Sequence, residues 1–363
     1  MKTTGILGRL TGCQREKTSE INLIARIGSA RDLAECYALH ESLRLPYTKT
    51  SCRIIPEMWR TLLAKGAMRL CLVANRARLV GSQIVSFSAL LFVSDEFCFQ
   101  ARSKLSPYLG VELARQYPWR QLPLLNHKQV GQANAGEGLN VIMCFEGCAH
   151  DGLSPGQLLA IREKQSEALH LALSGYHIKE FLANPIGTST LHWMLEAGAR
   201  LRRDYSSYFR KDRIPKPARS QRPYLIGLTK KEALAHPGSS IAGLFIYTPP
   251  RFGFSRSQQV LLRQALVGET CEQLATSLSV SPWTVKKCWH AIYERVADVD
   301  GELLPQAIAY GARVSSRGAE RRRHLLNYLR QHLEELRPYK PTSQMRRAGR
   351  QSPIPVPGCI AQH

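Results

Sequence analysis

The sequence lacks an apolar run long enough to cross a membrane as a helix. The longest run, IVSFSALLFV (84–93), covers about half of the roughly 20 residues that a spanning helix needs. Its β-branched and aromatic residues favour a buried strand instead. The segment LTGC (10–13) looks like a lipoprotein cleavage site, but Arg9 interrupts the short apolar run in front of it. We therefore expect a cytoplasmic protein that has no membrane partner.

Paired cysteines are also missing. The chain has 10 cysteines, and none of them forms a C-x-x-C pair. Cys144 and Cys148 lie four residues apart, but no H-x-x-x-H pattern accompanies them. Zinc sites are usually built from such pairs, and disulfides are rare in the cytosol. We therefore expect reduced, mostly buried thiols and no metal site.

Acidic residues are scarce relative to basic ones. The chain has 28 Asp and Glu against 50 Lys and Arg, which gives a formal net charge of +22. This excess says nothing about the fold, but it favours a polyanionic partner such as nucleic acid or an anionic membrane surface. The length of 363 residues is typical of two domains, and a hydrophobic content of 44% is enough to give them cores.

The apolar pattern predicts an α+β chain with an N-terminal mixed sheet and a C-terminal all-α part. Helices are expected at 29–44, 156–176 and 188–198, and strands at 68–93 (in two runs), 139–148, 178–184 and 199–210. The domains expected are a loose N-terminus (1–20), a sheet domain (21–210), a linker with an apolar patch (211–250), three helices (251–300), accessory helices (301–340, at 302–312 and 318–337) and a disordered basic tail (341–363).

Three helix starts are visible in the C-terminal part. Ser255 and Thr270 are each followed three residues later by glutamine, which is the capping-box pattern. Gly268 fits the end of the first helix, and Ser281–Pro282 fits the cap and first position of the third. A turn of about three residues separates the second helix from the third, which is the spacing of a helix-turn-helix.

The third predicted helix (282–296) has one apolar stripe. Val285, Ile292 and Val296 lie at spacings of seven and four, so they share a face. A helix with cations in its first turns, and the positive end of its dipole behind them, suits the phosphate-lined major groove of DNA. The residues left on other faces are Trp283, Lys286, Lys287 and His290.

Residues 254–296 resemble the LuxR-type helix-turn-helix. The segments FSRSQQVLL, VGETCEQLATSLSVS and TVKKCWHAIYERV carry the resemblance without a gap. The chain departs from the family at Gln258 and Gln273, where glutamates are usual, and at Cys288, where histidine is usual. The resemblance implies a sequence-specific transcriptional regulator that binds double-stranded DNA as a homodimer, on half-sites about 10 base pairs apart, with RNA polymerase as a further partner. It implies DNA contacts from Ser281, Thr284, Lys286, Lys287 and His290. Trp283 could contact the sugar-phosphate backbone or pack on the second helix.

The last predicted helix carries leucines on a 3-4-3 rhythm and many arginines. Two interpretations of the leucines stay open: a short dimer seam, or packing onto the preceding helices. The arginines are expected to add phosphate contacts. The leucines are Leu326, Leu329, Leu333 and Leu336.

Residues 21–210 resemble the GNAT acetyltransferase fold. The segments LVANRARLVGSQIVSFSALLFV, LNVIMCFEGC and IKEFLANPIGTSTLHWMLEAGARLRRDYSSYF carry the resemblance. The family binds the pyrophosphate of coenzyme A with a glycine-rich loop, but HDGLSPGQLLA offers only Gly152 and Gly156, and Pro155 lacks an N–H. Met194 stands where the family has its general-acid tyrosine, and Glu146 could serve as a base.

These departures predict a degenerate domain that senses a ligand or mediates assembly. We expect it not to be an enzyme and to hold no resident cofactor, with acetyl-CoA or another acyl-CoA as a candidate ligand. The alternative is an acetyl-CoA-dependent N-acetyltransferase with an accessory helix-turn-helix. A protein that coats nucleic acid without sequence preference is a third interpretation, and it rests on charge alone.

Overall fold

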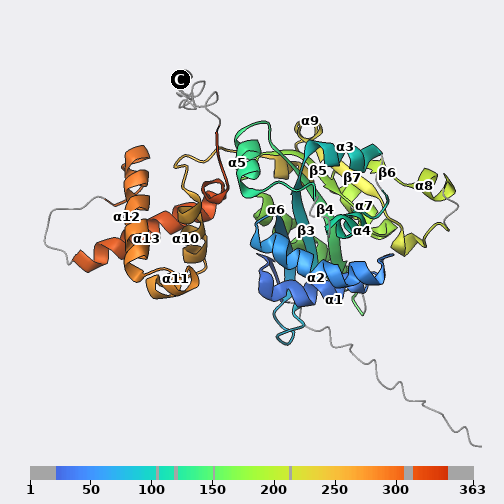
Figure 1. Cartoon of the computed structure of the whole chain (residues 1–363), viewed down its shortest axis with the longest axis horizontal. Helices are drawn as coiled ribbons and strands as arrows, with labels where there is room; N and C mark the ends of the chain where they lie inside the picture. Colours follow the sequence, from blue (N-terminus) through green and yellow to red (C-terminus); the bar gives the residue numbers. More distant parts are fainter. Residues whose placement is uncertain are drawn as a thin grey trace, which may run out of the picture.

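The computed structural model describes residues 22–103, 106–117, 122–149, 152–211, 215–305 and 314–341. An N-terminal domain is built on a mixed seven-stranded sheet, and a group of helices lies to one side of it (Figure 1). All neighbouring strands are antiparallel except β4 and β5, which are parallel. The strands, in sheet order, are β1 (Leu23–Ile27), β2 (Met68–Asn75), β3 (Ile84–Val93), β4 (Leu139–Cys148), β5 (Ile178–Ala183), β7 (Leu225–Thr229) and β6 (Arg200–Arg203).

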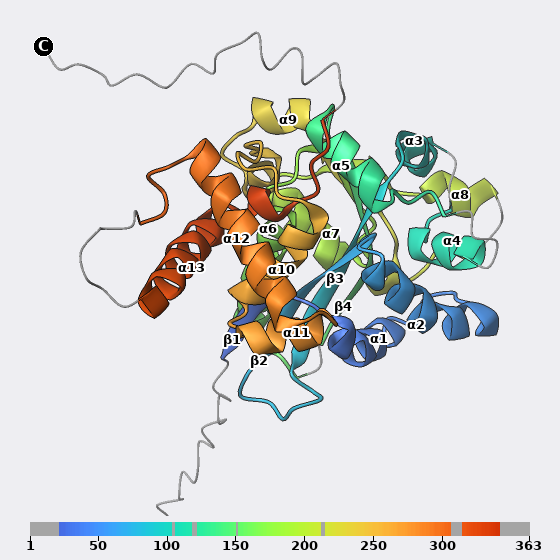
Figure 2. The same ribbon diagram turned by 60° about the vertical axis from the view of Figure 1, so that its left-hand side comes forward.

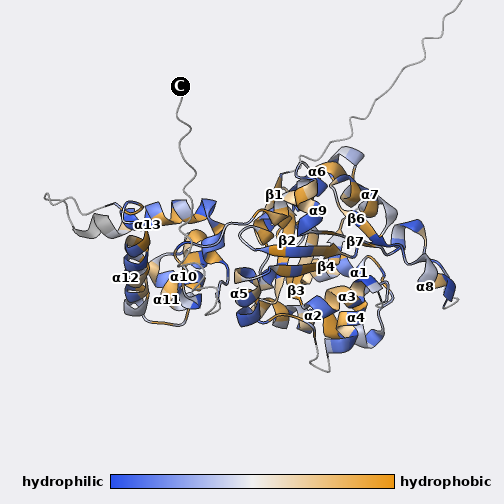
Figure 3. Ribbon diagram, turned by 90° about the horizontal axis from the view of Figure 1, so that it is seen from above, coloured by the Kyte–Doolittle hydropathy of each residue, from blue (hydrophilic) through white to orange (hydrophobic). Residues whose placement is uncertain are grey.

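Helices cover both faces of this sheet, so the central strands are buried on both sides. Along β3, Phe87 and Leu91 face one hydrophobic core, while Leu90 and Phe92 face the other. This explains why β3 is a continuous apolar run rather than an alternating one. Figure 3 shows apolar residues concentrated on these strands. The first core is covered by α1 (Leu33–Glu41), α2 (Lys49–Ala64), α3 (Asp95–Ser103) and α4 (Leu109–Gln116), and the second by α5 (His127–Ala135), α6 (Pro155–Leu173), α7 (Thr188–Glu196) and α9 (Lys230–Ala235).

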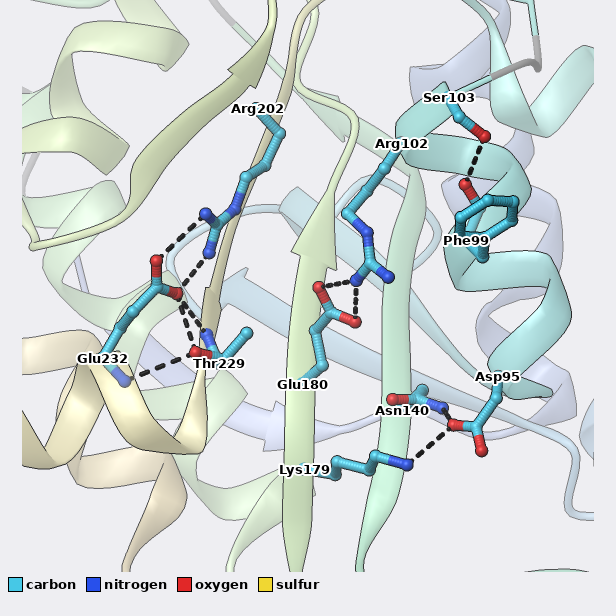
Figure 4. A network of polar contacts seen from close by, with 10 residues as sticks. All are labelled: Asp95, Phe99, Arg102, Ser103, Asn140, Lys179, Glu180, Arg202, Thr229 and Glu232. Carbon is cyan, nitrogen blue, oxygen red and sulfur yellow. Dashed lines mark hydrogen bonds and ion pairs between the residues drawn. The ribbon is translucent and has the colours of Figure 1, made fainter.

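Ion pairs join helices α3 and α9 to strands β5 and β6 of the sheet (Figure 4). Arg102 of α3 forms an ion pair with the buried Glu180 of β5. Arg202 of β6 forms an ion pair with Glu232 of α9, and this pairing lowers the pKa of Glu232 to about 2. These contacts bring together segments that lie far apart in the sequence.

The predicted linker with an apolar patch at 211–250 is too long, because part of it belongs to the sheet domain. Strand β7 lies there and is inserted between β5 and β6. Gly227 makes this pairing possible: a Cβ at this position would lie 2.5 Å from the carbonyl oxygen of Phe181. A 3-10 helix (Ser240–Phe245) then packs on the second core. Residues 225–245 therefore belong to the sheet domain.

The predicted strand at 199–210 is also shorter than expected. Strand β6 ends at Arg203, and a short helix, α8 (Ser206–Lys211), follows it. Tyr205 has a φ of 56°, and Asp204 accepts hydrogen bonds from the backbone N–H and hydroxyl of Ser206. This local turn reverses the chain, which the alternating pattern of side chains could not reveal.

The C-terminal helices begin where their caps predict. They are α10 (Arg256–Leu266), α11 (Cys271–Ser277) and α12 (Pro282–Val299). Ser255 and Thr270 form capping boxes with their glutamines, and Gly268 follows α10 with a φ of 93°. Residues 278–281 connect α11 to α12, and Ser279 has a φ of 54° in this turn. The helices share one hydrophobic core of their own.

The accessory helices differ from the prediction. Helix α13 runs from Val314 to Gln331, and a 3-10 turn (Leu333–Leu336) replaces the expected continuation to 337. Residues 302–305 are not helical, and the rest of the expected helix at 302–312 lies outside the described residues. The four leucines of the 3-4-3 rhythm pack in the core shared with α10–α12. The packing interpretation is therefore the one that the structure supports, and these leucines are not free to form a dimer seam.

The segment 332–341, here called the joining segment, contacts both parts of the molecule. The Arg337 guanidinium donates to the carbonyl oxygens of Ser174 (2.8 Å) and Leu171 (3.1 Å) at the end of α6. Its own carbonyl oxygen accepts from the side-chain amide of Gln259 in α10 (2.7 Å). Figures 1 and 2 show α10–α13 gathered beside the sheet domain. Among the helices of the described ranges, none is both long and apolar enough to cross a bilayer.

Candidate functional sites

The N-terminal turns of α12 carry all six candidate residues for DNA contact. Ser281 caps the helix by accepting from the N–H of Thr284 (3.1 Å), and the two hydroxyl oxygens lie 2.9 Å apart. Lys286 and Lys287 are exposed, and α10 lies between α12 and the sheet domain (Figures 1 and 3). The structure therefore brings the six residues together on a surface open to solvent, and their role in binding stays a prediction.

Trp283 is the most unusual member of this surface. Its side chain is 68% exposed, and the Lys287 ammonium lies 5.3 Å from its ring centroid. This distance is within the range of a cation–π contact, which orients the lysine beside the indole. The His290 ring lies 3.2 Å from the Glu294 carboxylate one turn further on, so the positive charge is concentrated in the first turns.

The buried face of α12 contains one residue that the sequence analysis missed. Trp289 is 5% exposed and lies on the stripe of Val285, Ile292 and Val296. The Arg322 guanidinium of α13 lies 5.0 Å from the Trp289 ring centroid, and it also donates to the carbonyl oxygen of Glu269. A 4-3-4 spacing through position 289 was the signal available in the sequence. Arg322 therefore fixes α12 against the α10–α11 connection rather than serving as a free cation.

A second candidate site lies where β4 and β5 part. Their pairing runs from Leu139 and Ile178 to Met143 and Ala183, and β4 then continues to Cys148 paired only with β3. Asn184 diverts the chain after β5, because its side chain donates to the carbonyl oxygens of Pro107 and Tyr224. A recess with a cavity volume of about 80 Å³, open to solvent, lies beyond the parting and is lined from β3, β4, α6 and α7.

Glu146 lines this recess from β4. Its carboxylate accepts a hydrogen bond from the N–H of Ile186 (2.9 Å), and burial raises its pKa to about 7. Its backbone carbonyl accepts from the Nδ1–H of His40 (2.8 Å), whose Nε2 in turn accepts from the Tyr47 hydroxyl (2.7 Å). Burial lowers the pKa of His40 to about 4, so the ring stays neutral and holds this end of β4 in place.

The remaining walls of the recess are mostly apolar. Met194 is buried there, so a thioether occupies the position where the GNAT resemblance implies an acid. Gln165 donates to the Ser88 hydroxyl (2.9 Å), and its side-chain oxygen is buried without a partner in the described structure. A ligand with a hydrogen-bond donor could satisfy that oxygen. The recess can therefore take an apolar ligand that carries a few polar groups.

The N-terminus of α6 offers few donors for a phosphate. Pro155 has no N–H, and the N–H of Gln157 is taken by the Ser154 hydroxyl (3.3 Å). The Gln157 side chain closes the capping box on the N–H of Ser154 (2.9 Å). Among the first three helical residues of this turn, all of which the structure describes, Gly156 alone has a backbone N–H that does not bond to the capping residue. The role of this turn in binding phosphate stays a prediction.

No protein-family model matches the chain, and no curated protein sequence matches it. Solved structures are similar to part of the chain. The C-terminal condensation domain of Ebony, in complex with beta-alanyl-dopamine, matches with a TM-score of 0.36 and 13% identity, over 58% of this chain and 100% of that chain. Arabidopsis thaliana NAA60, in complex with acetyl-CoA, matches with a TM-score of 0.34 and 12% identity, over 57% and 98% of the two chains.

FeeM, an N-acyl amino acid synthase from uncultured soil microbes, matches with a TM-score of 0.31 and 12% identity, over 58% of this chain and 92% of its own. Identities and scores this low fix neither a substrate nor a reaction for this chain.

Proposed function

We propose that the chain binds double-stranded DNA by placing α12 in the major groove. The observation that carries the proposal is the division of α12 into two faces. Val285, Trp289 and Ile292 are buried in the core, whereas Lys286 and Lys287 are exposed beside the positive end of the helix. A recognition helix needs this combination, because one face must be held rigidly while the other meets phosphates and base edges.

The connection between α11 and α12 supports the same proposal. The four residues 278–281 hold the two helices in contact, and Leu274 and Ala275 of α11 share the buried core with α12. Ala275 is small and 5% exposed where the helices approach each other. In this arrangement α11 would cross the DNA backbone while the hydroxyls of Ser281 and Thr284 contact phosphates.

The test is selection of bound duplexes from a random pool by the full chain at near-physiological salt. The variant is Lys286→Ala/Lys287→Ala, and the matched control is Lys211→Ala/Lys231→Ala, which removes two exposed lysines from the sheet domain. We expect the full chain and the control to enrich the same motif and the α12 variant to lose it. Tight binding with no enriched motif, unchanged in the α12 variant, would contradict the proposal.

A second function is favoured by the recess in the sheet domain. Glu146 lies in its wall with a pKa near 7, which is suited to a general base that accepts a proton from an attacking amine. This supports acyl transfer from an acyl-CoA as the alternative function. The test is release of the CoA thiol from acetyl-CoA with a panel of amines, in the wild type and in Glu146→Gln. Turnover that Glu146→Gln removes would support the enzyme, and its absence across the panel supports a binding domain.

A further inference from the structure

Basic side chains from three elements and the joining segment meet between the sheet domain and the helices. We call this group the basic junction. It shares no residue with the exposed surface at the start of α12 or with the recess lined by Glu146. Its members come from β2, the start of α5, helix α10 and the joining segment. They are Arg69, His127, Arg256, Arg263 and Arg337.

Tyr176 lies at the centre of the basic junction. The Arg69 guanidinium lies 5.2 Å from its ring centroid and donates to its hydroxyl. The Arg337 guanidinium lies 4.8 Å from the same centroid. Two cations thus share one ring. Arg337 is compensated, because it donates to carbonyl oxygens at the C-terminal end of α6, where the helix dipole is negative.

The other arginines have no such compensation. In the described ranges, no salt bridge includes Arg69, Arg256, Arg263 or Arg337. The buried Nε of Arg69 has no hydrogen-bond partner there, and Arg263 reaches only the carbonyl oxygen of Leu336 (3.3 Å). Burial, and then repulsion by Arg69, lowers the pKa of Arg263. Partly buried cations without a carboxylate are costly unless an anion comes from solution.

A second recess opens the basic junction to solvent. His127 and Arg256 also line an open recess between α2, the start of α5 and the start of α10, together with Lys65 and Lys128. One carboxylate, Glu57, lines this recess as well. Burial, and then the charges of Arg256 and Arg263, lowers the pKa of His127, so at neutral pH the ring is a neutral donor. This second recess thus exposes His127 and Arg256 to solvent, and Arg263 lies two turns further along α10.

We propose that the basic junction binds a small multivalent phosphate anion between Arg69, His127, Arg256 and Arg263. Guanidinium groups donate pairs of hydrogen bonds to phosphate oxygens, and two or more phosphate groups match the number of uncompensated arginines. The donors come from both parts of the molecule, so the bound anion ties α10 to the sheet domain. The chemistry fits pyrophosphate or the phosphate chain of a nucleotide.

The test measures the thermal midpoint of the full chain with inorganic pyrophosphate and, in a second arm, with ATP. We expect saturating pyrophosphate to raise the midpoint by roughly 3 °C or more. Arg263→Gln and Arg256→Gln should each lose most of this rise. Arg256 is exposed, so its variant should fold even if loss of Arg263 disturbs packing. A rise with ATP alone would identify the nucleotide as the source of the phosphates.

Two controls separate this site from other basic surfaces. Arg219→Gln changes an exposed arginine of the sheet domain and should keep the full rise. Lys286→Ala/Lys287→Ala should also keep it, even if DNA binding is lost. The proposal is overturned if both junction variants keep the full rise, or if the α12 variant abolishes it. It is also overturned if the junction variants weaken duplex DNA binding while neither phosphate compound changes the midpoint.

Discussion

Replacement of Glu146 by glutamine should change how stability depends on pH. Burial raises the pKa of this carboxyl from 4.5 to about 7. The folded chain therefore keeps a proton on Glu146 at pH values where the unfolded chain has released it. Folding takes up a proton in this window, so the free energy of unfolding falls as the pH rises from about 4.5 to about 7. Glu146→Gln has a similar volume and cannot ionise, so it should lack this contribution.

The expected magnitude follows from the size of the shift. A change from 4.5 to about 7, at 1.36 kcal/mol per pKa unit, corresponds to about 3 kcal/mol. Most of it should appear between about pH 5 and about pH 8.5, so Glu146→Gln should gain roughly 2 to 3 kcal/mol over the wild type across this range. The amide oxygen can still accept the hydrogen bond from Ile186, so that contact should not offset the gain.

The assay is urea denaturation of both proteins at several pH values. His40 also titrates with folding: its pKa is lowered to about 4, so the stability it contributes is present above about 6.5 and is lost as the pH falls towards 4. This contribution is common to both proteins and cancels in their difference. A difference in unfolding free energy that stays constant from about pH 5 to about pH 8.5 would refute the reasoning about the buried carboxyl.

Three further predictions concern the two domains. Trp289→Ala should lower the free energy of unfolding by about 3 to 5 kcal/mol, because this indole is buried. Trp283→Ala should change it by no more than about 0.5 kcal/mol, because that indole is exposed. Denaturant titration of both variants checks the difference. Gly227→Ala should destabilise the sheet domain by about 2 kcal/mol or more, because its Cβ would meet the backbone of β5 at 2.5 Å, and an unchanged thermal midpoint would contradict that close approach. Lys286→Ala/Lys287→Ala should lower the slope of log affinity against log salt by about 2 in duplex titrations, since each phosphate contact contributes about 0.9; an unchanged slope would place the phosphate contacts elsewhere.

Local signals were enough to predict the C-terminal helices. The caps at Ser255 and Thr270 and the stop at Gly268 act within a few residues, so the sequence displays them directly. The stripe on α12 was predicted for the same reason, although Trp289 was left out of it. Its 4-3-4 spacing with Val285, Ile292 and Val296 was the signal for burial, and its packing against Arg322 agrees with that signal.

Non-local pairing explains what the sequence could not show. Strand β7 follows a proline-rich segment, and its place between β5 and β6 depends on partners earlier in the chain. The same holds for the recess: Glu146 and Met194 were both singled out in the sequence, but their common cavity depends on where Asn184 turns the chain after β5. The basic junction was invisible, because its arginines are spread from position 69 to position 337.

The joining segment also sets an order of events during synthesis. The carbonyl oxygen of Ser174 receives its hydrogen bond from Arg337, which is added 163 residues later. A growing chain can therefore build the sheet domain and then α10–α12 while the end of α6 still faces water. The hydrogen bonds by which Arg337 links α10 to the end of α6 form only when residues 332–341 arrive. The same segment brings Leu333 and Leu336 to the core of α10–α12, so the helices complete their own packing and their link to α6 at the same late point.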